Sequence, residues 1–364
     1  MRSPRMFQGG VKNMSLDFLT KQGLGCMGMS EFYGAPMPEG DAINLIKKAF
    51  EKGIRFFDTA DVYAFGDNEK LLGAAVSDML KNNIVRDRLV IATKCGILRD
   101  RNDTTKRGTD NSYGYVKSAC DASLGRLGAD VGYIDLYYIH RIANNGVQLD
   151  EAMRAMAELL REGKIKAVGL SEATEEQIRS ANASLLKYTN SAHQISAVQS
   201  EYSLMTRIVE KNGVLNCCRE LGITFVAYSP LSRALLTGQV ETADQFPVDD
   251  FRRSLPRFSP ENLAKNKAIV GKVTELASKK NCTTAQIALA WVVAQGAIPI
   301  PGTTKLANLE SNLASNHVLF TTEELDQLNK LETASGTRYT DAAMKAYGFE
   351  SELLTQQLQK TNGM

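Results

Sequence analysis

The sequence predicts one α/β domain folded as a (β/α)8 TIM barrel, with its active site at the C-terminal face of the strands. From Gly23 onward, short apolar runs rich in β-branched and aromatic residues alternate with amphipathic stretches at a regular spacing. The chain holds about eight such pairs, which is the number that closes a barrel. No linker rich in Pro or Ser and no shift of composition divides the chain. A single domain of this length is common among α/β barrels.

Helices are expected where apolar residues recur about every three or four positions. This spacing marks residues 41–52, 69–80, 115–127, 150–162, 175–187, 210–221, 263–279 and 284–294. Glycines follow several of these stretches just before the next apolar run. They predict left-handed caps at the helix C-termini, at Gly53, Gly163, Gly222 and Gly296.

Strands are expected at the short apolar runs, because strands buried on both faces of a parallel sheet read as nearly continuous apolar sequence. The runs lie near Leu24 and at residues 54–58, 89–94, 133–140, 167–171, 197–201, 224–229 and 297–301. A polar side chain at the end of such a run points into the loops beyond. In α/β barrels, ligands bind at that edge.

An open doubly wound sheet would give the same alternation of strands and helices. Gly23, Gly25 and Gly28 also spell G-x-G-x-x-G. However, residues 29–36 do not open a helix, and a dinucleotide fingerprint needs that helix N-terminus for the pyrophosphate. We interpret the match as coincidental, and a dehydrogenase on an open sheet as the weaker alternative.

The composition excludes several classes of function. The chain has 364 residues, 43% of them hydrophobic and 23% charged, and a net charge of +2. This balance gives no electrostatic reason to expect a nucleic acid or a membrane as partner. No apolar run approaches the roughly 18–20 residues of a membrane span. Three histidines without paired spacing predict no metal site.

Six cysteines at irregular spacing, without Cys-x-x-Cys, predict reduced thiols and a cytoplasmic protein. Residues 1–20 contain no apolar core of a secretory signal and are expected to be a poorly ordered lead-in. Residues 21–350 are expected to form the barrel domain, and residues 351–364 a C-terminal tail.

Chemically active side chains stand at or just past the ends of the strand-like runs, namely Asp58, Tyr63, Lys94 and His140. Since such ends meet at one edge of a barrel, the four are expected to lie together. A carboxylate, a phenol, an ammonium and an imidazole predict a site that donates a proton to a carbonyl group. Taken singly, each has a structural explanation, such as a turn aspartate or a solvated lysine. Together they favour a catalytic role.

Short blocks along the chain resemble the aldo-keto reductases, in the branch that also contains the β subunits of voltage-gated potassium channels. The blocks are GLGCMGMS (23–30), FDTADVY (57–63), YYIHR (137–141), GLSE (169–172), VQSEYS (198–203), AYSPL (227–231) and IPGTTK (300–305). They occur in the family's order between about residues 24 and 349. The resemblance implies a barrel that binds NADP(H) over its C-terminal mouth without a Rossmann domain.

The resemblance also implies a role for each of the four residues. Tyr63 would donate the proton, and Lys94 would lower its pKa from the usual value of about 10. Asp58 would pair with Lys94 and compensate its buried charge. His140 would donate a hydrogen bond to the carbonyl oxygen and orient it.

The resemblance also implies contacts to the cofactor. Tyr228 would stack on the nicotinamide, and Ser171 and Gln199 would bind its carboxamide, with Glu172 standing where many relatives have Asn. The remaining contacts would line the loops around the cofactor: Gly25, Cys26, Met27, Ser229, Pro230, Leu231, Ser232, Gly302, Thr303, Thr304, Lys305, Asn308 and Asn312. Relatives usually have glycine at positions 232 and 234, so a Cβ there is expected to restrict the loop over the cofactor.

We therefore expect a reductase that converts an aldehyde or ketone to an alcohol with NADPH. The alternative is a regulatory subunit that senses NADP(H) through slow redox turnover. The expected binding partner is a small-molecule carbonyl substrate. The sequence leaves open whether the protein forms a homo-oligomer. Substrate choice is expected to depend on loops 30–37, 96–113 and 237–258, with pocket walls at Tyr33, Phe65, Phe251 and Phe258.

Overall fold

The central sheet of the computed structural model has eight parallel strands, arranged in the order in which they occur in the chain. The structure describes residues 21–103 and 106–346. The expected lead-in (1–20), the tail (351–364) and residues 347–350 of the expected domain lie outside this range. The strands are β1 (Leu24–Gly25), β2 (Phe56–Asp58), β3 (Val90–Cys95), β6 (Ile134–Ile139), β7 (Ile165–Ser171), β8 (Ile195–Glu201), β9 (Thr224–Tyr228) and β10 (Ile298–Pro299).

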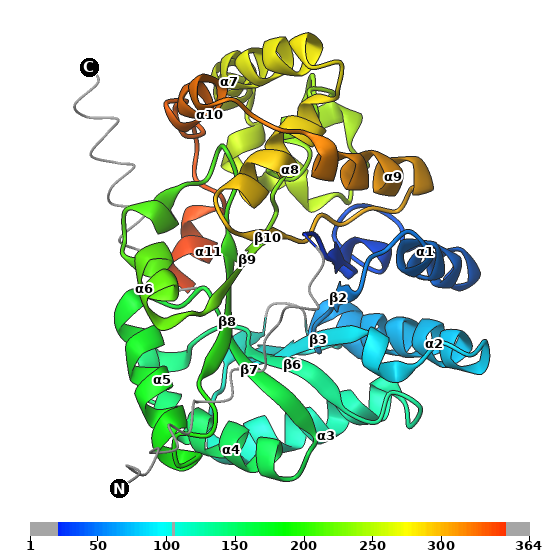
Figure 1. The fold of residues 1–364 in the computed structure, drawn as a ribbon, viewed down its shortest axis with the longest axis vertical. Helices are drawn as coiled ribbons and strands as arrows, with labels where there is room; N and C mark the ends of the chain where they lie inside the picture. Colours follow the sequence, from blue (N-terminus) through cyan, green and yellow to red (C-terminus); the bar gives the residue numbers. More distant parts are fainter. Residues whose placement is uncertain (1–20, 104–105, 347–364) are drawn as a thin grey trace, which may run out of the picture.

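The first and last strands meet, so the sheet closes into the predicted barrel. Gly23 N–H donates to Pro299 O at 2.9 Å, and Gly25 forms a parallel bridge with Gly302. Figure 1 shows the strands gathered around one axis with helices outside them. A doubly wound sheet would reverse its strand order at a switch point, and this sheet does not. The open-sheet alternative is therefore wrong.

Two glycines of the G-x-G-x-x-G match, Gly23 and Gly25, serve this closure. A Cβ on Gly23 would stand 2.6 Å from the Phe56 ring, and one on Gly25 would stand 2.9 Å from Ile300 O. Only a short 3-10 turn, Met27–Met29, follows them, and the next helix begins at Glu39. Close packing of strands thus explains the two residues.

The predicted helices are present, with ends that differ by a few residues. They are α1 (Glu39–Glu51), α2 (Asp67–Lys81), α3 (Tyr113–Leu127), α4 (Leu149–Arg161), α5 (Glu175–Tyr188), α6 (Val214–Leu221), α7 (Pro260–Lys279) and α8 (Thr284–Ala294). Capping boxes begin α5 at Thr174 and α8 at Thr283. The four glycines expected as caps have positive φ angles between 65° and 103°.

Several elements lack a clear period in the sequence and were not predicted. A two-stranded antiparallel hairpin, β4 (Ile97–Arg99) and β5 (Arg107–Thr109), lies in the charged segment after β3. In the part of the chain that the structure describes, three further helices follow β10: α9 (Leu306–Ala314), α10 (Thr322–Asn329) and α11 (Asp341–Ala346).

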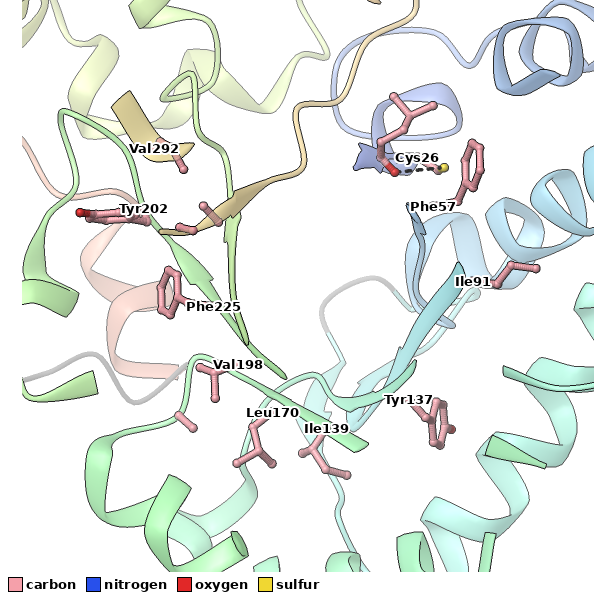
Figure 2. Packing of buried hydrophobic residues seen from close by; sticks show 14 of the residues in the cluster. Cys26, Phe57, Ile91, Tyr137, Ile139, Leu170, Val198, Tyr202, Phe225 and Val292 are labelled. Carbon is pink, nitrogen blue, oxygen red and sulfur yellow. Dashed lines mark hydrogen bonds between the residues drawn. The ribbon is translucent and has the colours of Figure 1, made fainter. Parts of the chain in front are cut away.

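Strand residues alternate between the barrel interior and the layer under the helices. The inner cluster of buried residues comes from the strands and Ile300, and it includes Phe56, Val90, Ala92, Leu136, Tyr138 and Ala197. Figure 2 shows their neighbours Phe57, Ile91, Tyr137 and Val198 pointing away from the strands toward the helices. This parity decides which side chains face the mouth of the barrel. No helix of the described residues is long and apolar enough to cross a membrane.

Candidate active site

Strand parity brings three of the predicted catalytic residues to the same end of the barrel interior. Asp58 ends β2, Lys94 lies near the end of β3, and His140 directly follows β6. These strands are neighbours in the sheet. Each residue lies two positions after an interior residue, namely Phe56, Ala92 and Tyr138. The interior apolar layers therefore end in a polar layer at the mouth.

Lys94 and Asp58 form a buried ion pair. Lys94 Nζ lies 2.5 Å from Asp58 Oδ1 and also donates to Thr59 O at 2.7 Å. Gln199 Nε2 donates to the other carboxylate oxygen, Asp58 Oδ2, at 2.8 Å. The Lys94 side chain is 0% exposed and that of Asp58 is 4% exposed. A buried pair is tolerated only with such complete hydrogen bonding.

Tyr63 and His140 lie beside this pair. Lys94 Nζ is 5.1 Å from the centre of the Tyr63 ring, whose edge meets the His140 ring with centres 5.7 Å apart. Burial raises the pKa of Tyr63, and the opposing effect of Lys94 is smaller. The expected lowering by Lys94 is present, but the expected net direction is wrong because burial outweighs it. Tyr63 is thus held as a protonated phenol at neutral pH.

Lys94 and His140 have defined charge states. Burial opposes the charge on Lys94, but Asp58 and Tyr63 outweigh it and raise the pKa of Lys94. Burial, with Arg141 and Lys94, lowers the pKa of His140 well below its usual value. His140 is therefore a neutral imidazole, and its buried Nδ1 has no hydrogen-bond partner among the described residues.

A cavity of about 920 Å³ opens at this end of the barrel. Asp58, Tyr63 and His140 line it. So do most of the residues expected at the cofactor, which are Gly25, Met27, Ser171, Gln199, Tyr228, Ser229, Pro230, Leu231, Gly302, Thr303, Thr304, Lys305, Asn308 and Asn312. Residues from distant parts of the chain thus meet in one cavity of the size that ligand sites have.

Two of the residues expected at the cofactor do not line the cavity. Cys26 is buried in the layer under the helices, where its thiol lies 3.7 Å from Leu24 O, and burial raises its pKa to about 12. Ser232 is buried, and its hydroxyl shares a hydrogen bond with that of Ser203. The residues on either side of each, Gly25 and Met27 or Leu231 and Arg233, do line the cavity.

The expected pocket walls are also partly corrected. Tyr33 and Phe251 line the cavity, together with Phe32 and the hairpin residues Arg99 and Arg107. Phe258 instead packs in the hydrophobic core and is 2% exposed. Phe65 is not a wall residue, and its ring lies against the guanidinium of Arg99 at 4.4 Å.

The segment after Pro230 adopts the conformation for which glycine is suited. Ser232, Arg233 and Ala234 have φ angles of 47°, 55° and 81°. Residues with a Cβ pay for this left-handed region with roughly 1–3 kcal/mol each. The loop of this chain therefore adopts the left-handed backbone conformation that suits glycine, although residues 232–234 all carry a Cβ.

Sequence reasoning missed the C-terminal side of the cavity, where Tyr339, Thr340 and Ala343 line the wall. Arg338 binds both oxygens of Glu172 at 2.8 and 2.9 Å, and Tyr228 OH lies 3.2 Å from Tyr339 OH. Burial opposes the charge of Glu172, but Arg338 lowers the pKa of Glu172 to about 2. No local pattern marks Arg338 as buried, because its partner is 166 residues away.

Comparison with known proteins agrees with this geometry. A model of the Aldo/keto reductase family matches residues 23–333. The soybean (Glycine max) protein "Probable aldo-keto reductase 1" is 43% identical over 313 residues, which cover 85% of this chain and 84% of the relative.

Solved structures of two relatives have the same fold. The glycerol dehydrogenase AKR11B4 from Gluconobacter oxydans superposes with a TM-score of 0.73 at 27% identity, over 85% of this chain and 90% of the relative. The thermostable aldo-keto reductase Tm1743, solved with the inhibitor epalrestat, gives a TM-score of 0.65 at 26% identity, over 85% of this chain and 94% of the relative. The chain therefore belongs to the aldo/keto reductase family of oxidoreductases, which reduce carbonyl groups.

Proposed function

We propose that this protein reduces an aldehyde or ketone to an alcohol with NADPH, and that Tyr63 donates the proton. The observation that carries the proposal is the buried Lys94–Asp58 pair beside Tyr63, opposite His140, at the wall of the large cavity. We also assign the chain to the branch related to potassium-channel β subunits, on the motifs around Tyr63 and Tyr228.

The cavity fits NADP(H) on chemical grounds. Tyr228 offers an aromatic face near Ser171, whose hydroxyl accepts from Arg141 at 3.1 Å and can still donate. Thr303 and Lys305 stand before the N-terminus of α9, and the Lys305 side chain is exposed, as a phosphate site requires. When bound there, the dihydronicotinamide supplies the hydride.

The residues of this chain supply the proton and the orientation. The neutral imidazole of His140 donates a hydrogen bond to the carbonyl oxygen. As the carbonyl carbon gains the hydride, the Tyr63 hydroxyl gives its proton to that oxygen, and the alcohol forms. The ammonium of Lys94 stabilises the phenolate left on Tyr63 until water returns a proton. Asp58 holds Lys94 in place and keeps the site close to neutral overall.

We propose a cytoplasmic location because all six cysteines of the chain are free and five of them are buried. A regulatory subunit with slow redox turnover is the second candidate. The strained loop at Ser232–Ala234 and the Tyr228–Tyr339 contact favour it, since both would slow cofactor exchange.

The direct test is purified full-length protein with a panel of aromatic and aliphatic aldehydes and ketones, and with NADPH or NADH. We expect one alcohol per NADPH consumed and a higher kcat/KM with NADPH. Hydride transfer in a single turnover that is much faster than kcat would favour the regulatory candidate. Binding of NADPH without any alcohol across the panel would contradict reductase activity.

A further inference from the structure

Tyr63 begins a loop whose backbone is strained. In the 3-10 turn Tyr63–Gly66, Ala64 and Phe65 have φ angles of 46° and 55°, and Gly66 has 90°. Ala64 and Phe65 carry a Cβ, for which this left-handed region is strained. Such a conformation persists only where the surroundings fix it, and two charged residues do so here.

The two peptide groups that flank Tyr63 are both held by one ion pair. Arg99 Nη1 donates to Val62 O at 3.0 Å, and Ala64 N–H donates to Glu31 Oε2 at 2.9 Å. Arg99 and Glu31 bind each other through both ends, at 2.9 Å (Nη1 to Oε2) and 2.7 Å (Nη2 to Oε1). The side chains are only 11% and 20% exposed.

We propose that Glu31 and Arg99 act as a clasp that positions Tyr63 for proton transfer. Glu31 comes from the loop after β1, Tyr63 from the loop after β2, and Arg99 from the hairpin strand β4 after β3. The clasp therefore joins three successive loops at the mouth of the barrel. Neither residue exchanges a proton with the substrate, so both are positioning residues.

The geometry explains why this pair is bidentate. A planar guanidinium can hold two carboxylate oxygens and still direct a donor at a carbonyl, whereas a single ammonium cannot. The Arg99 guanidinium also covers the Phe65 ring at 4.4 Å. Because the backbone is fixed before and after Tyr63, the phenol already lies beside Lys94 and His140 before substrate binds. No conformational entropy then has to be lost to order it when substrate arrives. Misplacing a reacting group by about 1 Å costs up to about 100-fold in rate.

This inference rests on the proposed function for its effect on rate, but not for its effect on the backbone. The test therefore has two measurements, made on the full-length chain. One is amide hydrogen exchange over residues 62–66 without any ligand, and the other is the steady-state kinetics of carbonyl reduction. Arg99→Met removes the clasp, and Arg99→Lys keeps the charge but cannot serve Glu31 and Val62 together.

Arg101→Met is the matched control. Arg101 lies close by in the chain after β4, stacks on Phe65 at 5.2 Å and pairs with Asp67, but touches neither peptide group of Tyr63. We expect faster exchange at Ala64 and a kcat lowered about 10- to 100-fold in Arg99→Met, with the KM for NADPH changed less than about twofold. Arg99→Lys should be intermediate and Arg101→Met unchanged.

Each other outcome has a defined meaning. Wild-type kcat and wild-type exchange in both Arg99 variants would overturn the clasp. A lowered kcat with unchanged exchange at Ala64 would also overturn the clasp. Arg99 would then affect the rate only through its positive charge at the cavity wall. If the wild type reduces no carbonyl but Arg99→Met still speeds exchange, the clasp holds and the proposed function is wrong.

Discussion

The two sides of the cavity are built by different means. On one side, Asp58, Lys94 and His140 lie on or next to the neighbouring strands β2, β3 and β6, and the alternation of each strand places them. On the other side, Tyr228 is held by Arg338 and Tyr339 from a segment more than 100 residues further along the chain. The first side is an extension of the barrel core, and the second is a set of long-range polar contacts.

Two buried carboxylates, Glu172 and Asp61, differ in what sets their pKa. Arg338 lowers the pKa of Glu172 to about 2. Burial raises the pKa of Asp61 to about 8, since Glu69 adds to the shift and Arg126 opposes it only in part. Charge pairing decides the first value and desolvation the second. Lys94→Met and Arg338→Met should therefore both destabilise the fold, but they should impair different steps of the reaction.

The largest effect is expected from Lys94→Met. It leaves Asp58 buried without its cation, so we expect a loss of about 3–5 kcal/mol in the free energy of unfolding. Activity should fall about 100- to 10,000-fold, because Tyr63 loses the charge that stabilises its phenolate. Thermal unfolding and kcat measure the two effects. The double variant Asp58→Asn, Lys94→Met should recover stability without activity, and recovered activity would contradict the role of Lys94.

Arg338→Met tests the other side. Glu172 would stay buried without its partner, which costs up to about 3–5 kcal/mol, and the double variant Glu172→Gln, Arg338→Met should restore most of this. In the parent, the Glu172 contribution is present above the unfolded pKa of about 4.3 and is lost as the pH falls toward 2. Because Tyr228 loses its anchor, we expect weaker NADPH binding and little change in the rate of hydride transfer. An unchanged affinity of Arg338→Met for NADPH would contradict the idea that this side of the cavity serves cofactor binding.

Asp61→Asn tests desolvation on the first side. Folded Asp61 keeps its proton up to about pH 8, whereas the unfolded side chain loses it near pH 4. The parent therefore loses stability as the pH rises between these values, by at most about 1.4 kcal/mol per pH unit, and no more above pH 8. The stability gained by Asp61→Asn should grow over the same range. Urea unfolding at pH 6, 7, 8 and 9 measures it, and a gain independent of pH would contradict the assignment.

The smallest effect is expected from Ala234→Gly. Ala234 has a φ of 81°, so removing its Cβ should raise the free energy of unfolding by up to about 1 kcal/mol. Thermal unfolding measures this gain. Ala155→Gly in helix α4 is the opposite control and should destabilise the protein, because it puts glycine in a helix and removes a buried methyl group. A loss of stability in Ala234→Gly would show that the loop is unstrained.

The contrast also explains what the sequence could predict. The ends of the short strand-like runs were enough to group Asp58, Lys94 and His140, because in a parallel barrel the strands end at the same edge. The helix caps at Gly53 and Gly222 are local as well. Arg338 with Glu172, and Arg99 with Glu31, could not be predicted, because their partners lie 166 and 68 residues away in loops without a period. The side chains of Cys26 and Ser232 do not line the cavity, and a resemblance in sequence does not say which way a loop side chain turns.

Single-turnover hydride transfer in Tyr63→Phe tests the central claim most directly. The enzyme is saturated with NADPH, mixed with excess aldehyde, and followed by the absorbance of the cofactor. The control is Tyr188→Phe, which removes a hydroxyl that binds Asp150 outside the cavity. We predict that Tyr63→Phe slows the transfer by about 100-fold or more, while its affinity for NADPH and the rate in Tyr188→Phe stay within about twofold. A Tyr63→Phe variant that transfers hydride at the wild-type rate would contradict the account.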